Sequence, residues 1–117
     1  MFIPDSLPKP LLAYEKALER LIEKYPIKKL YLFGSVLGSL FNPLKSDIDI
    51  LVEFEEEHLK PEEIGSILLD FSWEIEQILG RKVDVIRNRT FKNPYFEQSL
   101  NRTKKLIYER ERTKILV

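Results

Sequence analysis

The fold is decided by residues 30–54, which read LYLF-GS-VLGSLFNPLK-SDIDILVEF. Two apolar runs flank a Gly-Ser turn and a loop, so this stretch predicts two strands and their connection. The second run begins with Asp47 and Asp49, and because side chains alternate across a strand, both carboxylates point to one face. Adjacent carboxylates repel each other, and Asp is unfavourable in strands. Such a conflict inside an apolar strand marks a candidate functional site.

The composition is that of a globular protein with no strong net charge. At 117 residues the chain predicts a single domain over 1–117. Lys plus Arg and Asp plus Glu number 19 each, so no global field draws the protein to nucleic acid, and a nucleic-acid partner is not expected. The absence of Cys excludes disulfides and thiolate chemistry. No apolar run approaches the ~20 residues of a membrane span, and no signal peptide is apparent. We therefore expect a cytoplasmic protein that does not associate with a membrane.

The spacing of apolar residues predicts alternating helices and strands. Residues 30–33 form a continuous apolar run, which is typical of a central strand covered on both faces. Phe96, Leu100, Thr103 and Ile107 recur at steps of three and four, which predicts that the last helix extends through Ile107. The expected elements are a helix over 11–25, a strand over 27–33, one or two helical turns over 36–40, a strand over 46–54, a helix over 60–79 ended by Gly80, a strand over 81–86 and a helix from Asn93.

These elements predict an α/β (α+β) domain with a small mixed three-stranded sheet flanked by helices. Residues 1–10 contain three prolines and are expected to form an extended lead-in. Residues 110–117 form a charged tail with an apolar end, and whether that tail packs, pairs or frays stays open.

Three carboxylates are candidates for a metal site, because Asp84 lies in a third apolar strand and joins Asp47 and Asp49 if the two strands are neighbours. A set of oxygen ligands without Cys or His favours Mg²⁺ or Mn²⁺ over zinc. Two such ions ~3.5–4 Å apart fit between carboxylates at this spacing and would serve phosphoryl transfer. One carboxylate would also accept a proton from an attacking group.

The Gly34-Ser35 turn is the candidate phosphate site. A glycine lets the backbone approach a phosphate, and a serine hydroxyl with successive amides forms an anion cradle. An antiparallel arrangement of the first two strands would bring this turn beside the carboxylates. Four basic side chains are candidate contacts for a triphosphate or substrate, namely Lys45, Arg81, Arg87 and Arg89.

Each signal alone has an ordinary structural explanation. Gly-Ser turns are common in loops, Asp-Ile-Asp is often a surface strand end, and Asp84 could be a satisfied polar residue. Trp73 is better explained as a core or interface residue than as a base-stacking platform. The ordered combination of turn, Asp-x-Asp and a later isolated Asp is much more specific.

The combination resembles the DNA polymerase beta-like nucleotidyltransferase superfamily. The residues that carry the resemblance are Phe33-Gly34-Ser35, eleven intervening residues, Asp47-Ile48-Asp49-Ile50, and Val83-Asp84-Val85. It covers roughly residues 10–110, and the short length is similar to the minimal nucleotidyltransferases, the MntA-like antitoxins. The resemblance implies the nucleotidyltransferase fold and an ATP-dependent enzyme whose partner is a HEPN-type toxin.

Carried over by position, the resemblance implies that Asp47 and Asp49 bind two Mg²⁺ ions, and that Asp84 binds the catalytic ion and helps to deprotonate the acceptor. Gly34 and Ser35 would hold the nucleotide phosphates. Many minimal members continue the turn with a small residue, an Arg and a Gly, whereas this chain has Val36-Leu37-Gly38. Lys45 or an arginine of the third strand would then have to supply the missing charge.

Two functions follow from these observations. The first is Mg²⁺-dependent transfer of AMP from ATP to a hydroxyl group of a partner toxin, with this chain as the antitoxin. The alternative is a catalytically weak or inactive binding module that neutralises its partner by complex formation, suggested by the altered turn, Phe41, Trp73 and the apolar C-terminal end. An oligomer is compatible with both. Transfer to a nucleic acid is a third, weaker alternative, which neutral charge argues against.

Overall fold

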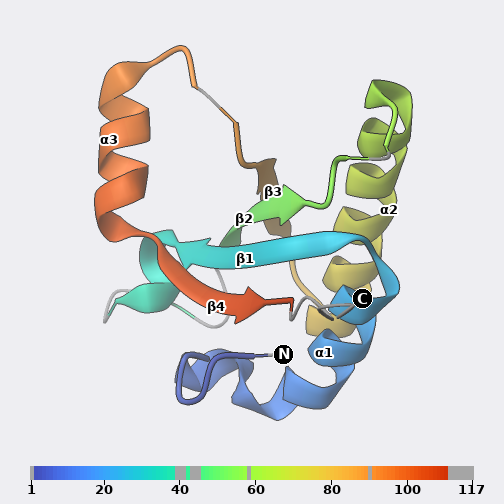
Figure 1. Ribbon diagram of the computed structural model, residues 1–117. Helices are drawn as coiled ribbons and strands as arrows, with labels where there is room; N and C mark the ends of the chain where they lie inside the picture. Colours follow the sequence, from blue (N-terminus) through green and yellow to red (C-terminus); the bar gives the residue numbers. More distant parts are fainter. Residues whose placement is uncertain (1, 39–41, 43–45, 58, 90, 111–117) are drawn as a thin grey trace, which may run out of the picture.

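The computed structural model of the chain describes residues 2–38, 42, 46–57, 59–89 and 91–110. Helices and strands alternate along it (Figure 1). The elements are the 3₁₀ helix η1 (Lys9–Tyr14), α1 (Glu15–Lys24), β1 (Ile27–Phe33), the 3₁₀ helix η2 (Gly34–Leu37), β2 (Ile48–Phe54), α2 (Pro61–Leu79), β3 (Val83–Arg87), α3 (Pro94–Thr103) and β4 (Lys105–Glu109).

The strands form one mixed sheet in the order β3-β2-β1-β4. Strand β1 is central, as its apolar run predicted, and it is antiparallel to both β2 and β4. Strands β2 and β3 are parallel, which requires the crossover that α2 supplies. The mixed α/β architecture is therefore confirmed, but the sheet has four strands rather than the three predicted from the sequence.

The fourth strand replaces the end of the predicted last helix. Helix α3 stops at Thr103, and Ile107 lies in β4, where it is 2% exposed. Strand β4 pairs with the free edge of β1, with Leu32 opposite Lys105 and Leu30 opposite Tyr108. The prediction was wrong because this long-range pairing outweighs the local helical spacing of Leu100, Thr103 and Ile107.

The main core lies on the sheet face covered by α1 and α2. Leu30 and Leu32 of β1 lie opposite Val52 and Ile50 of β2, and all four are essentially buried. The helix residues that pack over them include Leu18, Leu21, Ile22, Phe71 and Ile75. The apolar stripes that predicted these two helices are thus the stripes that the core buries.

The ends of the helices follow the local signals in the sequence. Helix α2 has Pro61 in its first turn, followed by Glu62 and Glu63. It ends at Gly80, whose φ of 64° is left-handed, as is usual after a helix. Within the described residues, no helix combines the length and apolarity that crossing a bilayer would require.

Long-range contacts attach both ends of the described chain to the rest of the fold. Phe2 packs edge-on against Tyr108, and the buried Ser6 hydroxyl donates to the Ile107 carbonyl, so the N-terminal lead-in contributes to the core.

The Arg110 guanidinium donates to the carbonyls of Ile22, Glu23, Tyr25 and Ile27 at 2.6–3.3 Å. These carbonyls lie at and just after the end of α1, where a helix leaves backbone acceptors unpaired. The predicted tail beyond Arg110 lies outside the described residues.

Candidate functional site

The candidate site lies on the sheet face opposite the main core. Asp49 in β2 and Asp84 in β3 are directly paired in the parallel register, so their carboxylates lie side by side. Asp47 immediately precedes β2, two residues before Asp49. The structure therefore brings Asp49 and Asp84 together, as expected if the second and third predicted strands were neighbours.

Gly34 is in direct contact with Asp49. Phe33 pairs with Asp49 at the end of β1, and the chain then turns at Gly34 with a left-handed φ of 76°. A β-carbon built at Gly34 would lie 2.3 Å from Asp49 Oδ2, so the carboxylate would have to move to make room for a side chain. Only glycine combines this backbone angle with this close approach. The antiparallel pairing thus places the predicted turn against the carboxylate.

Asp49 is in an unfavourable place for a negative charge. Partial burial raises the pKa of Asp49, and repulsion from Asp84 and then Asp47, together with a hydrogen bond to Asp84, raises it further. The two largest of these causes are loss of solvent and nearby like charge, and both disfavour an ionised carboxylate. A cation bound at this face would reverse the second cause.

Lys82 supplies part of that positive charge. Its ammonium lies 3.9 Å from Asp47 Oδ2 and 3.9 Å from Asp84 Oδ1, while its side chain remains 67% exposed. Ion pairs of this length and exposure contribute little and are easily displaced. Lys82 was absent from the residues predicted from the sequence. Its position two residues before Asp84, which places it on the same strand face, is the signal that could have found it.

The donors fit a hard divalent cation by their chemistry. All three are carboxylates, and the lysine ammonium already lies between two of them. As the side chains stand, no three Asp, Glu, His or Cys residues in the described part of the chain are grouped closely enough to hold a metal ion. The Asp47 and Asp84 side chains are 44% and 45% exposed, so a cation from solvent has access to both carboxylates.

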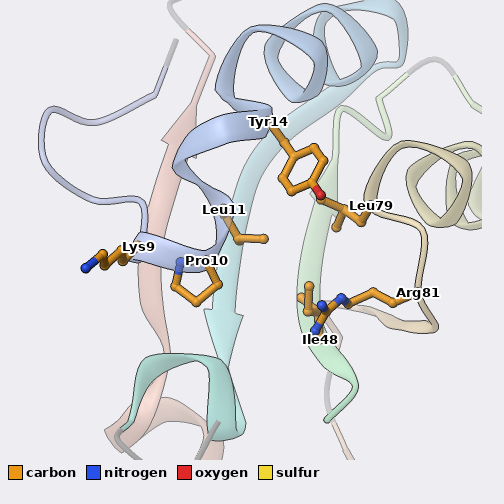
Figure 2. Close-up of a pocket in the computed structure, with 7 residues that line it drawn as sticks. All are labelled: Lys9, Pro10, Leu11, Tyr14, Ile48, Leu79 and Arg81. Atoms are coloured by element: carbon orange, nitrogen blue, oxygen red, sulfur yellow. The ribbon is translucent and has the colours of Figure 1, made fainter. Parts of the chain in front are cut away.

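Arg81 lies on the other side of the sheet from the carboxylates. Together with Tyr14, Leu79 and Ile48 it lines a cavity of about 420 Å³, and Figure 2 shows its guanidinium beside Ile48. Ile48 precedes Asp49 in β2, and since side chains alternate, it points to the core face. Arg81 therefore does not join the carboxylate group in this structure.

Two more of the predicted basic residues, Arg87 and Arg89, are not at the carboxylates either. Arg87 lies at the far end of β3 and is paired with Glu56. Arg89 lies beyond β3 and lines a surface hollow with Glu57 and Asn88. Lys45, the predicted phosphate contact in the loop before β2, lies outside the described residues. Ser35 is the first residue after Gly34 in η2, and its carbonyl accepts from the Gly38 amide at 3.0 Å.

Comparison with known proteins identifies relatives of this chain. A family model described as a nucleotidyltransferase domain matches residues 14–115. Two curated proteins of Methanocaldococcus jannaschii are similar to the chain. "Putative protein adenylyltransferase MJ1379" is 38% identical over 78 residues, which is 67% of this chain and 74% of that protein. "Putative protein adenylyltransferase MJ0128" is 41% identical over 80 residues, with the same coverage.

Solved structures share the fold. A chain of a crystal structure described as the toxin–antitoxin with AMP-PNP superposes with a TM-score of 0.60 at 21% identity, covering 83% of this chain and 74% of that one. A chain of the toxin–antitoxin MntA-HepT superposes with a TM-score of 0.55 at 20% identity, covering 84% and 72%. At this identity the similarity establishes the fold, which includes the four-stranded mixed sheet.

Proposed function

Because the chain belongs to the nucleotidyltransferase domain family, we propose that it transfers AMP from ATP to a hydroxyl group of a partner protein, with Mg²⁺ as the metal. The observation that carries the proposal is the pairing of Asp49 with Asp84 on neighbouring strands, with Gly34 against Asp49. The names of the curated relatives support protein adenylylation, and the AMP-PNP complex of a structural neighbour supports a nucleotide donor.

The reaction is a displacement at the α-phosphorus of ATP. The acceptor oxygen forms a new bond to that phosphorus while the bond to the bridging oxygen of the β-phosphate breaks, so pyrophosphate leaves. The hydroxyl proton passes to a carboxylate, a role that the pairing with Asp49 makes suitable for Asp84. Gly34 and Ser35 hold the phosphates by their backbone and hydroxyl groups. Bound Mg²⁺ supplies the positive charge that the three carboxylates and the phosphates require.

We further propose that the acceptor is a HEPN-type toxin and that this chain acts as its antitoxin in the cytoplasm, where ATP is available. The support comes from the structural neighbours, which are toxin–antitoxin complexes. The acceptor hydroxyl would approach the sheet face that carries Asp49 and Asp84, because the opposite face is filled by the core.

The experiment uses ATP labelled at the α-phosphate, the co-purified partner as acceptor, and the double substitution Asp47→Asn with Asp49→Asn. We expect label transfer to require Mg²⁺ and to be lost in the double variant while circular dichroism stays unchanged. The matched control is Asp70→Asn, which removes an exposed carboxylate on α2 and should transfer normally. Unchanged transfer by the Asp47/Asp49 variant would refute the proposal.

A second function is favoured by one observation on α2. Trp73 and Leu69 lie one helical turn apart and are 65% and 73% exposed, which is unusual for such large apolar side chains. The surface formed by Leu69 and Trp73 is suited to binding a partner protein without a catalytic step. If the Asp47/Asp49 variant still neutralises a co-expressed partner at unchanged stoichiometry, while Trp73→Ala does not, complex formation rather than AMP transfer is the function.

A further inference from the structure

Lys104 lies at the end of α3 and was not singled out by the sequence. Its amide donates to the Leu100 carbonyl at 2.8 Å, which closes the last turn of the helix. Its ammonium lies 4.6 Å from the centre of the Tyr31 ring. In the described part of the chain the neutral Tyr31 ring is the contact of this ammonium, and no carboxylate forms an ion pair with it. A ring holds a cation without neutralising its charge.

The ring that holds Lys104 is on the carboxylate face of the sheet. Tyr31 pairs with Leu51, and Phe33 pairs with Asp49, so Tyr31 and Asp49 are diagonal neighbours on one face. Diagonal neighbours in an antiparallel pair are about 7–8 Å apart, within reach of a long side chain. The ammonium therefore lies over the same face as Asp49 and Asp84.

The topology holds this end of α3 close to the Gly34 turn. Lys105 pairs with Leu32, one residue before Phe33 and two before Gly34. Figure 1 shows β4 starting from the end of α3 and running along β1. Since α3 is followed directly by β4, the position of Lys104 is fixed by the sheet pairing rather than by a loop.

We propose that Lys104 is a phosphate-binding residue that contacts the β- and γ-phosphates of the nucleotide. This inference rests on the proposed function, because it assumes that the α-phosphate lies at Asp49 and Asp84. The phosphates that follow would then lie between the Gly34 turn and the end of α3, where Lys104 can reach them. A lysine ammonium binds phosphate as a point charge on a flexible stem, so it can leave the ring and reach a bound triphosphate.

A purely structural role is the competing explanation. A cation near a helix C-terminus stabilises the helix through the dipole and the unpaired carbonyls. Such a role affects stability and leaves the nucleotide affinity unchanged. The two roles therefore differ in what they do to nucleotides with different numbers of phosphates.

Lys105 provides the matched control. It is the next residue, carries the same charge and is exposed, but it pairs with Leu32, whose side chain points into the core face. By alternation its side chain lies on the opposite face from Tyr31 and Asp49. Any general effect of removing one positive charge from this segment should be equal in Lys104→Met and Lys105→Met.

The test measures the affinity of the full chain for AMP-PNP and for AMP by calorimetry with Mg²⁺. We expect Lys104→Met to weaken AMP-PNP binding about tenfold, the loss typical of one charge-assisted hydrogen bond. Binding of AMP should change less than twofold. Lys104→Arg should restore most of the affinity for AMP-PNP, and Lys105→Met should bind both nucleotides like the wild type.

Four results would overturn the inference. If the wild type binds AMP-PNP and Lys104→Met binds it equally well, Lys104 is structural and the proposed function is untouched. If Lys104→Met weakens the binding of AMP and of AMP-PNP equally, the contact with the terminal phosphates is absent. The same conclusion follows if Lys105→Met loses as much affinity for AMP-PNP as Lys104→Met does. If the wild type binds neither nucleotide, both this inference and the proposed function fall.

Discussion

Replacing Gly34 with alanine tests whether the turn and the carboxylate are in contact. The left-handed backbone at Gly34 costs an alanine roughly 1–2 kcal/mol. The new β-carbon would also lie 2.3 Å from Asp49 Oδ2, so the carboxylate must move by about 1 Å into a strained rotamer at about 0.5–1.5 kcal/mol. The free energy of unfolding should therefore fall by about 1.5–3.5 kcal/mol.

Two other glycines separate these contributions. Gly80 has a φ of 64° but nothing within 4 Å of a built β-carbon. The free energy of unfolding of Gly80→Ala should therefore fall by about 1–2 kcal/mol, which is the cost of the left-handed backbone alone. Gly38 lies four residues after Gly34 with a φ of −118°, and its nearest contact would be ordinary at 3.8 Å. Gly38→Ala should therefore be nearly neutral.

The assays are thermal unfolding by circular dichroism and AMP transfer. For a domain of this size each kcal/mol corresponds to roughly 4–5 °C in the unfolding temperature, so we expect that temperature to fall by about 6–18 °C for Gly34→Ala and by about 4–10 °C for Gly80→Ala. A shift of about 1 Å in a reacting group can cost about 10²-fold in rate. Transfer should be lost in Gly34→Ala alone. Equal stability of the Gly34 and Gly80 variants with normal transfer in both would refute the contact.

Two further predictions concern charge. Burial and the neighbouring Asp84 and Asp47 raise the pKa of Asp49, so the folded state binds its proton more tightly than the unfolded state does, and its ionisation destabilises the fold as pH rises. Urea titrations in EDTA should show that Asp49→Asn is more stable than the wild type at about pH 7.5. This gain in stability should vanish below about pH 4, where the carboxyl group is protonated in the unfolded state as well. A gain that is equal at both pH values would contradict the prediction. Arg110→Met should lose about 2–3 kcal/mol, since it leaves the carbonyls around the end of α1 without their charged donor. Arg102→Met, which removes an exposed arginine of α3, is its control in the same titration, and equal stability of the two variants would count against the role of Arg110.

The sequence predicted the arrangement of the carboxylates because local rules determine most of it. Alternation sets the common face of Asp47 and Asp49. The crossover through α2 is long enough to make β2 and β3 parallel neighbours, which brings Asp84 beside Asp49. The strong apolar stripe of α2 and its Pro and Gly boundaries made that crossover recognisable from the residues alone.

The sequence predicted that antiparallel pairing would bring the Gly34 turn beside the carboxylates, but it did not predict what depends on the exact register between distant segments. The direct contact of Gly34 with Asp49 follows from the pairing of Phe33 with Asp49, and no local pattern specifies that register. Strand β4 is stabilised by its pairing with the edge of β1, and this pairing joins residues far apart in the sequence. The residues of β4 therefore carried no decisive local signal for a strand. Lys104 was missed for the same reason: its place over Tyr31 exists only once β4 has formed.

Stability and function oppose each other at Asp49. The fold holds this carboxylate partly buried beside two others, and it compensates with Lys82, whose ion pairs are long and exposed. Such pairs return less free energy than the burial and repulsion remove. Within the described residues no ion pair reaches Asp49 itself, so its charge stays poorly compensated, and a ligand that brings a cation to this face binds the folded state selectively and stabilises it. A carboxylate retained at this cost, with a glycine held against it by an unfavourable backbone angle, is better explained by ligand binding than by folding.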